Sequence, residues 1–191
     1  MCIRDSLCGN TTLVTPVLAE IADEQLSEFH SQDWDKSILA IATTFTGGAI
    51  SLDCWIDEID TDKGRKFLRN FKAAVPDMLK GVDFAFMDAA PGLDGQAGDA
   101  AEYSKLARYY IHNRLFRLNK NWIGLGPACM QEGDIIVVFT GSPMSTVLRP
   151  ANNGKDQYYL MGESYIYDIA MGQAYDIMEK EGVEENMFEL I

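Results

Sequence analysis

The spacing of apolar residues changes near His112, and this change constrains the fold more than any other feature of the chain. Before it, apolar residues recur at helical intervals, as Leu68, Phe71 and Val75 do. After it, they form short runs bounded by glycine, proline and asparagine, which is typical of strands. The sequence therefore predicts an α+β fold: a mainly helical N-terminal part, then a small antiparallel β-barrel or curled sheet, and a C-terminal helix.

Four helices are expected before His112, and aspartate, glycine and proline mark their limits. Asp33 can cap the second helix, and Gly47 and Gly48 can end it, because these residue types are favoured at helix termini. Pro76 is expected to kink or split the third helix, since proline lacks a backbone donor and clashes with the preceding turn. The predicted helices are residues 16–29, 34–45, 63–80 and 100–112.

Residues 135–139 (IIVVF) form an unbroken apolar run, which indicates a strand buried on both faces. Shorter or alternating runs surround it, and such closely spaced strands suggest a small curled sheet or barrel. A closing helix is expected at 171–181, and the acids after it are interpreted as a solvated, partly disordered tail. The predicted strands are residues 114–118, 122–125, 134–140, 146–149, 157–161 and 164–169.

These patterns divide the chain into a helical region at 7–112, a small β-barrel module at 113–175 and an acidic tail at 176–191. Residues 1–6 (MCIRDS) look like a translated adapter sequence and are interpreted as a non-native leader. The chain is therefore expected to be a fragment of a longer protein.

Acids outnumber bases by 29 to 16, which gives a formal net charge of −13. This charge repels phosphate backbones and anionic membrane surfaces, so neither nucleic acid nor membrane is expected as a partner. Cys2, Cys8, Cys54 and Cys129 lie far apart and fit neither a disulfide framework nor a zinc site. No apolar run of about 20 residues and no signal segment is found. We therefore expect a cytoplasmic protein with reduced thiols.

No complete catalytic, metal or cofactor motif is found. The loop at 89–98 lacks the glycine spacing of a nucleotide site, and Arg65 replaces the turn glycine of a calcium loop. Ile166 replaces the last glycine of a nucleophile elbow in GESYI, so Ser164 is interpreted as a strand residue. A thiolate of Cys8 or Cys129 paired with His30 or His112 stays an open alternative. We expect no enzyme activity, no catalytic residue, no metal and no cofactor.

The stretch WIGLGPACMQEGDIIVVF is the most patterned part of the chain. Gly124 and Gly126 are expected to permit backbone turns that other residues resist, and Pro127 to stiffen the connection. Gly133 and Asp134 are expected to form a tight entry into the buried strand. These residues predict turns and strands of a barrel, without an attached reaction.

This stretch and its surroundings closely resemble the C-terminal region of fungal heterokaryon incompatibility (HET) proteins. The resemblance rests on GLGP, GD, an apolar run, LR and GES-Y in the same order, and is dense over residues 114–174. Asp168 and Gln173 depart from the pattern at its end. The matching residues, which the resemblance marks as a structural signature, are Arg114, Gly124, Gly126, Pro127, Gly133, Asp134, Gly141, Arg149, Gly162, Glu163 and Tyr165.

The resemblance implies a non-catalytic regulatory or protein-interaction region of a non-self recognition protein. The N-terminal HET domain of such proteins has no counterpart here, and that domain is a candidate partner. The alternative is a small-ligand-binding or cryptic enzymatic module with a pocket between the helical part and the barrel. Arg149 and Glu163 each end an apolar strand, where a lone charge favours a partner. An ion pair between them is one hypothesis, and solvated strand ends are the alternative.

Overall fold

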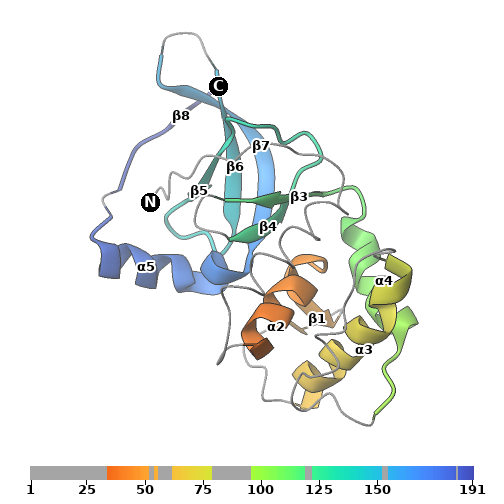
Figure 1. Cartoon of the computed structure of the whole chain (residues 1–191). Coiled ribbons are helices and arrows are strands. Elements are labelled where there is room, and N and C mark those ends of the chain that lie inside the picture. Colours follow the sequence, from red (N-terminus) through yellow and green to blue (C-terminus); the bar gives the residue numbers. More distant parts are fainter. Residues whose placement is uncertain are drawn as a thin grey trace. The chain divides into compact units, whose positions relative to one another are not determined.

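The computed structural model describes residues 34–51, 54–55, 62–78, 96–118, 122–151, 155–183 and 185–191 (Figure 1). The chain divides into two compact units between Ile111 and His112. The first predicted helix and most of the loop at 89–98 lie outside the described residues.

The helical unit is built around Tyr103, whose side chain is completely buried. Its hydroxyl donates to the carbonyl oxygen of Ala42 at 2.7 Å, and its ring centroid lies 5.4 Å from that of Phe67 and 5.1 Å from that of Phe71. This one tyrosine therefore joins three helices. The elements of the unit are α2 (Trp34–Thr44), β1 (Ala49–Ser51), β2 (Cys54–Trp55), α3 (Asp62–Met78), α4 (Ala100–Ala107) and the short 3₁₀ helix η2 (Arg108–Tyr110).

Some helix termini follow the sequence, whereas α4 ends at Ala107, before the predicted end at 112. The predicted cap Asp33 lies outside the described residues. Gly47 and Gly48 take φ values of 58° and 91° just after α2, a conformation that favours glycine. Asp99 caps α4, because its side chain accepts from the backbone N–H groups of residues 101 and 102. The expected split at Pro76 is wrong: α3 runs through it uninterrupted. Within the described residues, α3 continues for two residues past Pro76.

The second unit contains an open six-stranded sheet with the order β3-β4-β7-β6-β5, and β8 added to β7. All pairs are antiparallel except β7 with β8. Among the described strands no pairing joins β3 to β5, so the α+β class is confirmed with the sheet open. The strands are β3 (Arg114–Arg117), β4 (Ile123–Gly126), β5 (Ile135–Val138), β6 (Ser145–Pro150), β7 (Gln157–Ile166) and β8 (Glu189–Leu190).

Two strands predicted at 157–161 and 164–169 are one long strand, β7. Gly162 with φ of 142° lies inside it, where the pairing with β6 shifts by one residue. Gly162 lies opposite Val147 and Leu160 lies opposite Leu148, so Met161 is the extra residue of a β-bulge. The bulge keeps the strand continuous where the sequence suggested an interruption. The residues after β7 form the 3₁₀ helix η3 (Tyr167–Gly172) and then α5 (Gln173–Glu181).

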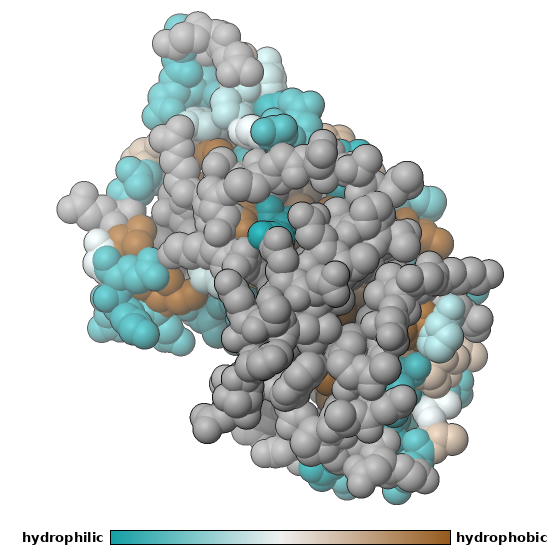
Figure 2. Space-filling model, viewed as in Figure 1, coloured by the Kyte–Doolittle hydropathy of each residue, from teal (hydrophilic) through white to brown (hydrophobic). Residues whose placement is uncertain are grey.

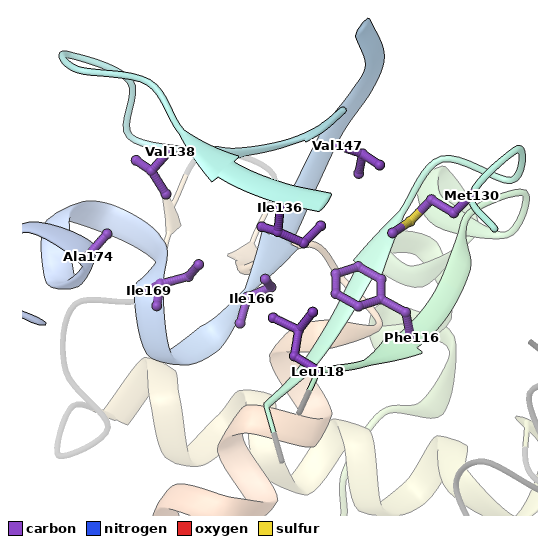
Figure 3. Close-up of a cluster of buried hydrophobic side chains, with 9 residues drawn as sticks. All are labelled: Phe116, Leu118, Met130, Ile136, Val138, Val147, Ile166, Ile169 and Ala174. Carbon is purple, nitrogen blue, oxygen red and sulfur yellow. The ribbon is translucent and has the colours of Figure 1, made fainter. Parts of the chain in front are cut away.

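The core confirms that β5 is buried on both faces. Ile136 and Val138 belong to one apolar cluster, while Ile135 and Val137 belong to another. Figure 3 shows the first cluster, in which side chains from β3, β5, β6, β7, η3 and α5 point toward one another. Its buried members are Phe116, Leu118, Met130, Ile136, Val138, Val147, Ile166, Ile169 and Ala174.

The interpretation of the C-terminal residues as a solvated, partly disordered tail is wrong for their last part. Residues 189–190 form β8, and the N–H of Ile191 donates to the carbonyl oxygen of Tyr158 at 3.0 Å. Phe188 packs against the second apolar cluster. Glu179, Glu181, Glu185 and Glu189, which suggested a tail, are exposed. Figure 2 accordingly shows hydrophilic side chains around α5 and the end of the sheet on the face in view.

Candidate functional site

The polar centre of the sheet unit is an ion pair between Asp134 and Arg149. Asp134 precedes β5 and Arg149 lies on β6, and the antiparallel register that sets Ile135 opposite Leu148 brings the two side chains together. Arg149 Nε donates to Oδ1 of Asp134 at 2.7 Å, and Nη2 donates to Oδ2 at 2.9 Å. The guanidinium and the carboxylate therefore form a bidentate ion pair with two parallel hydrogen bonds.

The carboxylate of Asp134 is completely buried. Besides the two bonds from Arg149, its Oδ2 accepts the backbone N–H of Gln131 at 2.9 Å. Gly133 has a φ of 90°, which lets the chain turn back toward the strand, and the N–H of Asp134 donates to the carbonyl oxygen of Gln131. These bonds offset the cost of removing the charge from water.

Two arginines hold consecutive carbonyl oxygens of the loop that follows β4. Arg149 Nη2 donates to the carbonyl of Cys129 at 2.7 Å, and Arg114 Nη1 donates to that of Met130 at 2.6 Å. The N–H of Met130 in turn donates to the carbonyl of Pro127 at 3.0 Å. We call Arg114, Asp134 and Arg149, with the loop 127–134 that they hold, the loop clamp.

The charge of Arg149 suits this role. Its hydrogen bond to Asp134 raises the pKa of the guanidinium, and burial opposes the rise only in part. The side chain of Arg149 is 23% exposed, so it lies between the interior and the surface. A permanently charged, planar donor there can serve a buried carboxylate and a backbone carbonyl together.

Gly124 and Gly126 have a different role from the one expected. Both lie inside β4, not in a turn. A Cβ on Gly124 would lie 2.4 Å from Cζ of Phe116, its partner on β3, and one on Gly126 would lie 2.3 Å from Sδ of Met130. The prediction of turns is therefore wrong for these two glycines. Because they have no side chain, Phe116 and Met130 can pack closely against the backbone of β4.

Two other glycines of the signature lie at a turn and at a close packing contact: Gly141 and Gly162. Gly141, with φ of 86°, donates its N–H to the hydroxyl of Tyr175 at 2.7 Å, which ties the β5–β6 turn to α5. A Cβ on Gly162 would lie 2.8 Å from Cγ of Pro127, so the clamped loop packs on the bulge of β7. Tyr165 is buried opposite Leu125 on β4.

The hypothesis of an ion pair between Arg149 and Glu163 is wrong. The register places Glu163 opposite Thr146, whereas Arg149 lies opposite Tyr159 and bonds to Asp134. Glu163 is exposed. The sequence predicts Asp134 only as part of the entry into the buried strand, and its contact with Arg149 depends on the register of β5 with β6.

Ser164, Cys129 and His112, which the sequence raised as candidates for catalysis, are among the described residues. Ser164 is a buried strand residue, as predicted, and its hydroxyl lies 2.9 Å from that of Ser145. Cys129 is exposed beside the clamp, and His112 lies in a turn of the same unit. Within the described ranges, no three His, Cys, Asp or Glu side chains gather as metal ligands. Nor does any described helix combine the length and hydrophobicity that crossing a membrane requires.

The clamp lies wholly inside a segment with known relatives. Residues 93–184 match the Het-6 beta-barrel domain family. The chain is also 36% identical over 75 residues to heterokaryon incompatibility protein 6, OR allele, of Neurospora crassa. That alignment covers 39% of this chain and 11% of the relative's length. No solved structure matches. The resemblance to HET proteins, inferred from the signature residues, is confirmed.

Proposed function

We propose that this chain is a non-catalytic regulatory or protein-interaction region of a HET-type non-self recognition protein. The observation that carries the proposal is the match of residues 93–184 to the Het-6 beta-barrel domain family. The similarity to a heterokaryon incompatibility protein supports it. The HET domain of such proteins is the first candidate partner.

The loop clamp gives this role a physical basis. Arg114, Asp134 and Arg149 direct their hydrogen bonds inward, to one another and to the backbone of the loop. The same loop exposes Cys129, Gln131 and other side chains to solvent. A surface loop fixed from within loses little conformational entropy on binding, which favours recognition of a protein partner. We propose that the exposed side of the clamped loop contacts that partner.

A chimera tests the proposal. Residues 93–184 of this chain replace the matching segment in the Neurospora crassa protein, and the incompatibility reaction is scored in pairings of strains. The chimera is expected to accumulate and to give a reaction. A second chimera carries Gln131→Ala and Glu132→Ala, two exposed changes that leave the clamp bonds in place; its reaction is expected to weaken at an unchanged protein level. A stable chimera without any reaction would contradict the HET-type role, and an unaltered reaction of the loop variant would contradict the role of the loop.

A further inference from the structure

The C-terminal residues occupy an edge of β7 in a way unlike the rest of the sheet. β8 is parallel to β7 and pairs with it at two positions only, Gln157 with Glu189 and Tyr158 with Leu190. The side-chain amide of Gln157 donates to the carboxylate of Glu189 at 2.6 Å. Because β6 pairs with the other edge of β7, β8 lies on the same edge as β4.

One aromatic side chain anchors this segment. Phe188 packs against the cluster of Ile135, Val137, Leu148 and Tyr158, with its ring edge-on to that of Tyr158 at 5.1 Å. The apolar side chains around it point outward: Met187 is 95% exposed, Ile191 53% and Leu190 45%. A short backbone ladder with a single aromatic anchor is how an extended peptide binds to the edge of a sheet.

The edge extends beyond the segment that fills it. In the direction in which β8 runs, β7 continues through Tyr159 and Leu160, whose side chains are 47% and 58% exposed. Among the described residues, strand pairing on this edge resumes only at Tyr165, with β4. A longer segment could therefore continue the ladder where β8 stops. Two paired residues and one anchor also make β8 one of the easiest parts of the sheet to open.

We propose that the β7 edge from Gln157 to Leu160 is a strand-addition site, which residues 187–191 fill within the chain and a protein partner fills by displacing them. The partner contributes an extended segment parallel to β7, at least five residues long and free of proline, since each ladder position needs its backbone groups. It carries an aromatic residue at the position of Phe188 and an apolar residue against Leu160. This inference rests on the proposed interaction function and adds the type of partner.

A peptide-binding experiment tests the site. The probe is a fluorescein-labelled peptide with the sequence of residues 183–191, VEENMFELI, and its anisotropy is followed with the full chain. In the unchanged chain the resident segment competes at the high effective concentration of a tethered ligand. The Phe188→Ala chain is expected to bind the peptide about tenfold more tightly than the unchanged chain, because its resident segment has lost its anchor.

Matched controls separate displacement from general loosening. Met187→Ala removes a side chain that is 95% exposed, so this chain is expected to bind the peptide as the unchanged chain does. A peptide with alanine at the position of Phe188 is expected to bind about tenfold more weakly. Equal affinity of the Phe188→Ala and unchanged chains would overturn the proposal.

A reversible disulfide between β7 and β8 tests the proposal even if the Phe188→Ala chain does not fold. Gln157→Cys with Glu189→Cys places two thiols on paired positions, about 5 Å apart at Cα, which suits a disulfide. Cys129→Ser is added because Cys129 is exposed. The oxidised chain is expected to lose peptide binding and the reduced chain to regain it; equal binding in the two forms would overturn the proposal.

A second copy of the chain is the competing occupant. Two further chains carry Cys129→Ser with either Gln157→Cys or Glu189→Cys. If they form a disulfide between positions 157 and 189 on mixing, a second copy fills the edge, and the choice of a different protein is overturned. The peptide measurements do not depend on the incompatibility assay. A chimera that fails there while the peptide binds would refute the HET-type role and leave the site standing.

Discussion

At the scale of single residues, Asp134 is the residue of the loop clamp to which Arg149 and the backbone of the loop bond. A buried carboxylate is costly unless its oxygens are bonded, and here Arg149 and the N–H of Gln131 supply the bonds. The same guanidinium continues to the carbonyl of Cys129, so one side chain fixes both ends of the loop. Removing the arginine is therefore worse than removing the pair, because it leaves the carboxylate buried and alone.

Arg149→Ala is expected to lower the free energy of unfolding by roughly 3 kcal/mol, the size associated with breaking a buried pair. The double variant Asp134→Ala with Arg149→Ala is expected to lose less than the two single losses added together. Glu163→Ala, an exposed change on the neighbouring strand, is the control and should stay within about 0.5 kcal/mol. Urea unfolding of the unchanged chain, the two single variants, the double variant and Glu163→Ala measures this. Additive losses would show that Asp134 and Arg149 act independently.

Glu102 makes a pH-dependent contribution to the stability of the helical unit. Its pKa is lowered, first by the hydrogen bond from Lys66, whose Nζ lies 2.9 Å from the carboxylate, with Asn70 adding a second bond. A folded-state pKa below the ordinary value of 4.5 means that the ionised form stabilises the fold. This contribution is complete above pH 4.5 and is lost as the pH falls through the lowered pKa.

Glu102→Gln should therefore be less stable than the unchanged chain near neutral pH, and the difference should shrink as the pH falls toward about 3. Thermal melts across this range test the sign. If the stability difference between the two chains stayed constant with pH, the glutamine would be destabilising because of its packing, and the charge of Glu102 would contribute nothing to stability. Asp62→Asn is a matched control, because Asp62 is an exposed acid whose bond to Arg65 stays within one helix turn.

At the scale of elements, β4 shows what the sequence could predict and what it could not. The strand itself follows from an apolar run between turn residues, and so does the double burial of β5. The function of Gly124 could not be predicted, because it depends on Phe116 lying directly opposite on β3. Strand pairing is set by the whole sheet, while glycine in isolation indicates only conformational freedom.

The same limit explains β7 and the ion pair. Gly162 was interpreted as an interruption, since a bulge is defined by the partner strand and has no signature of its own. Arg149 was expected beside Glu163 because both residues follow apolar runs, but register assigned Arg149 to Asp134. Local patterns thus predicted the elements, and errors arose wherever the answer depended on pairing.

Gly124→Ala is expected to lower the free energy of unfolding by about 1–3 kcal/mol, because the added methyl would overlap Phe116 and Ile166. Phe116→Leu in the same chain should recover part of this loss by making room. Gly141→Ala is the comparison: no atom would meet its Cβ, so its cost is one of backbone conformation, and Phe116→Leu should not relieve it. A double-mutant cycle in urea tests the coupling, and an absence of coupling at Gly124 would refute the packing explanation.

At the scale of the whole molecule, charge is the dominant feature. A formal net charge of −13 means that folding brings like charges together, which opposes the compact state. The acids are numerous in the last part of the chain, where Glu181, Glu185 and Glu189 are all exposed. Exposed repulsion of this kind is screened by salt, whereas the short bonds of the loop clamp are screened much less.

Raising NaCl from about 0.02 M to about 0.5 M is therefore expected to raise the melting temperature by a few degrees, as screening shortens from roughly 20 Å to a few ångströms. The Arg149→Ala chain should gain about the same increment, because the clamp it lacks acts through direct, partly buried contacts. An equal ionic strength of sodium sulfate separates screening from the additional stabilisation that sulfate gives through exclusion from the surface. A melting temperature that falls with NaCl would show that attractive surface pairs outweigh the net repulsion. Surface ion pairs such as Lys66 with Glu102 would then contribute more to stability than the net charge suggests.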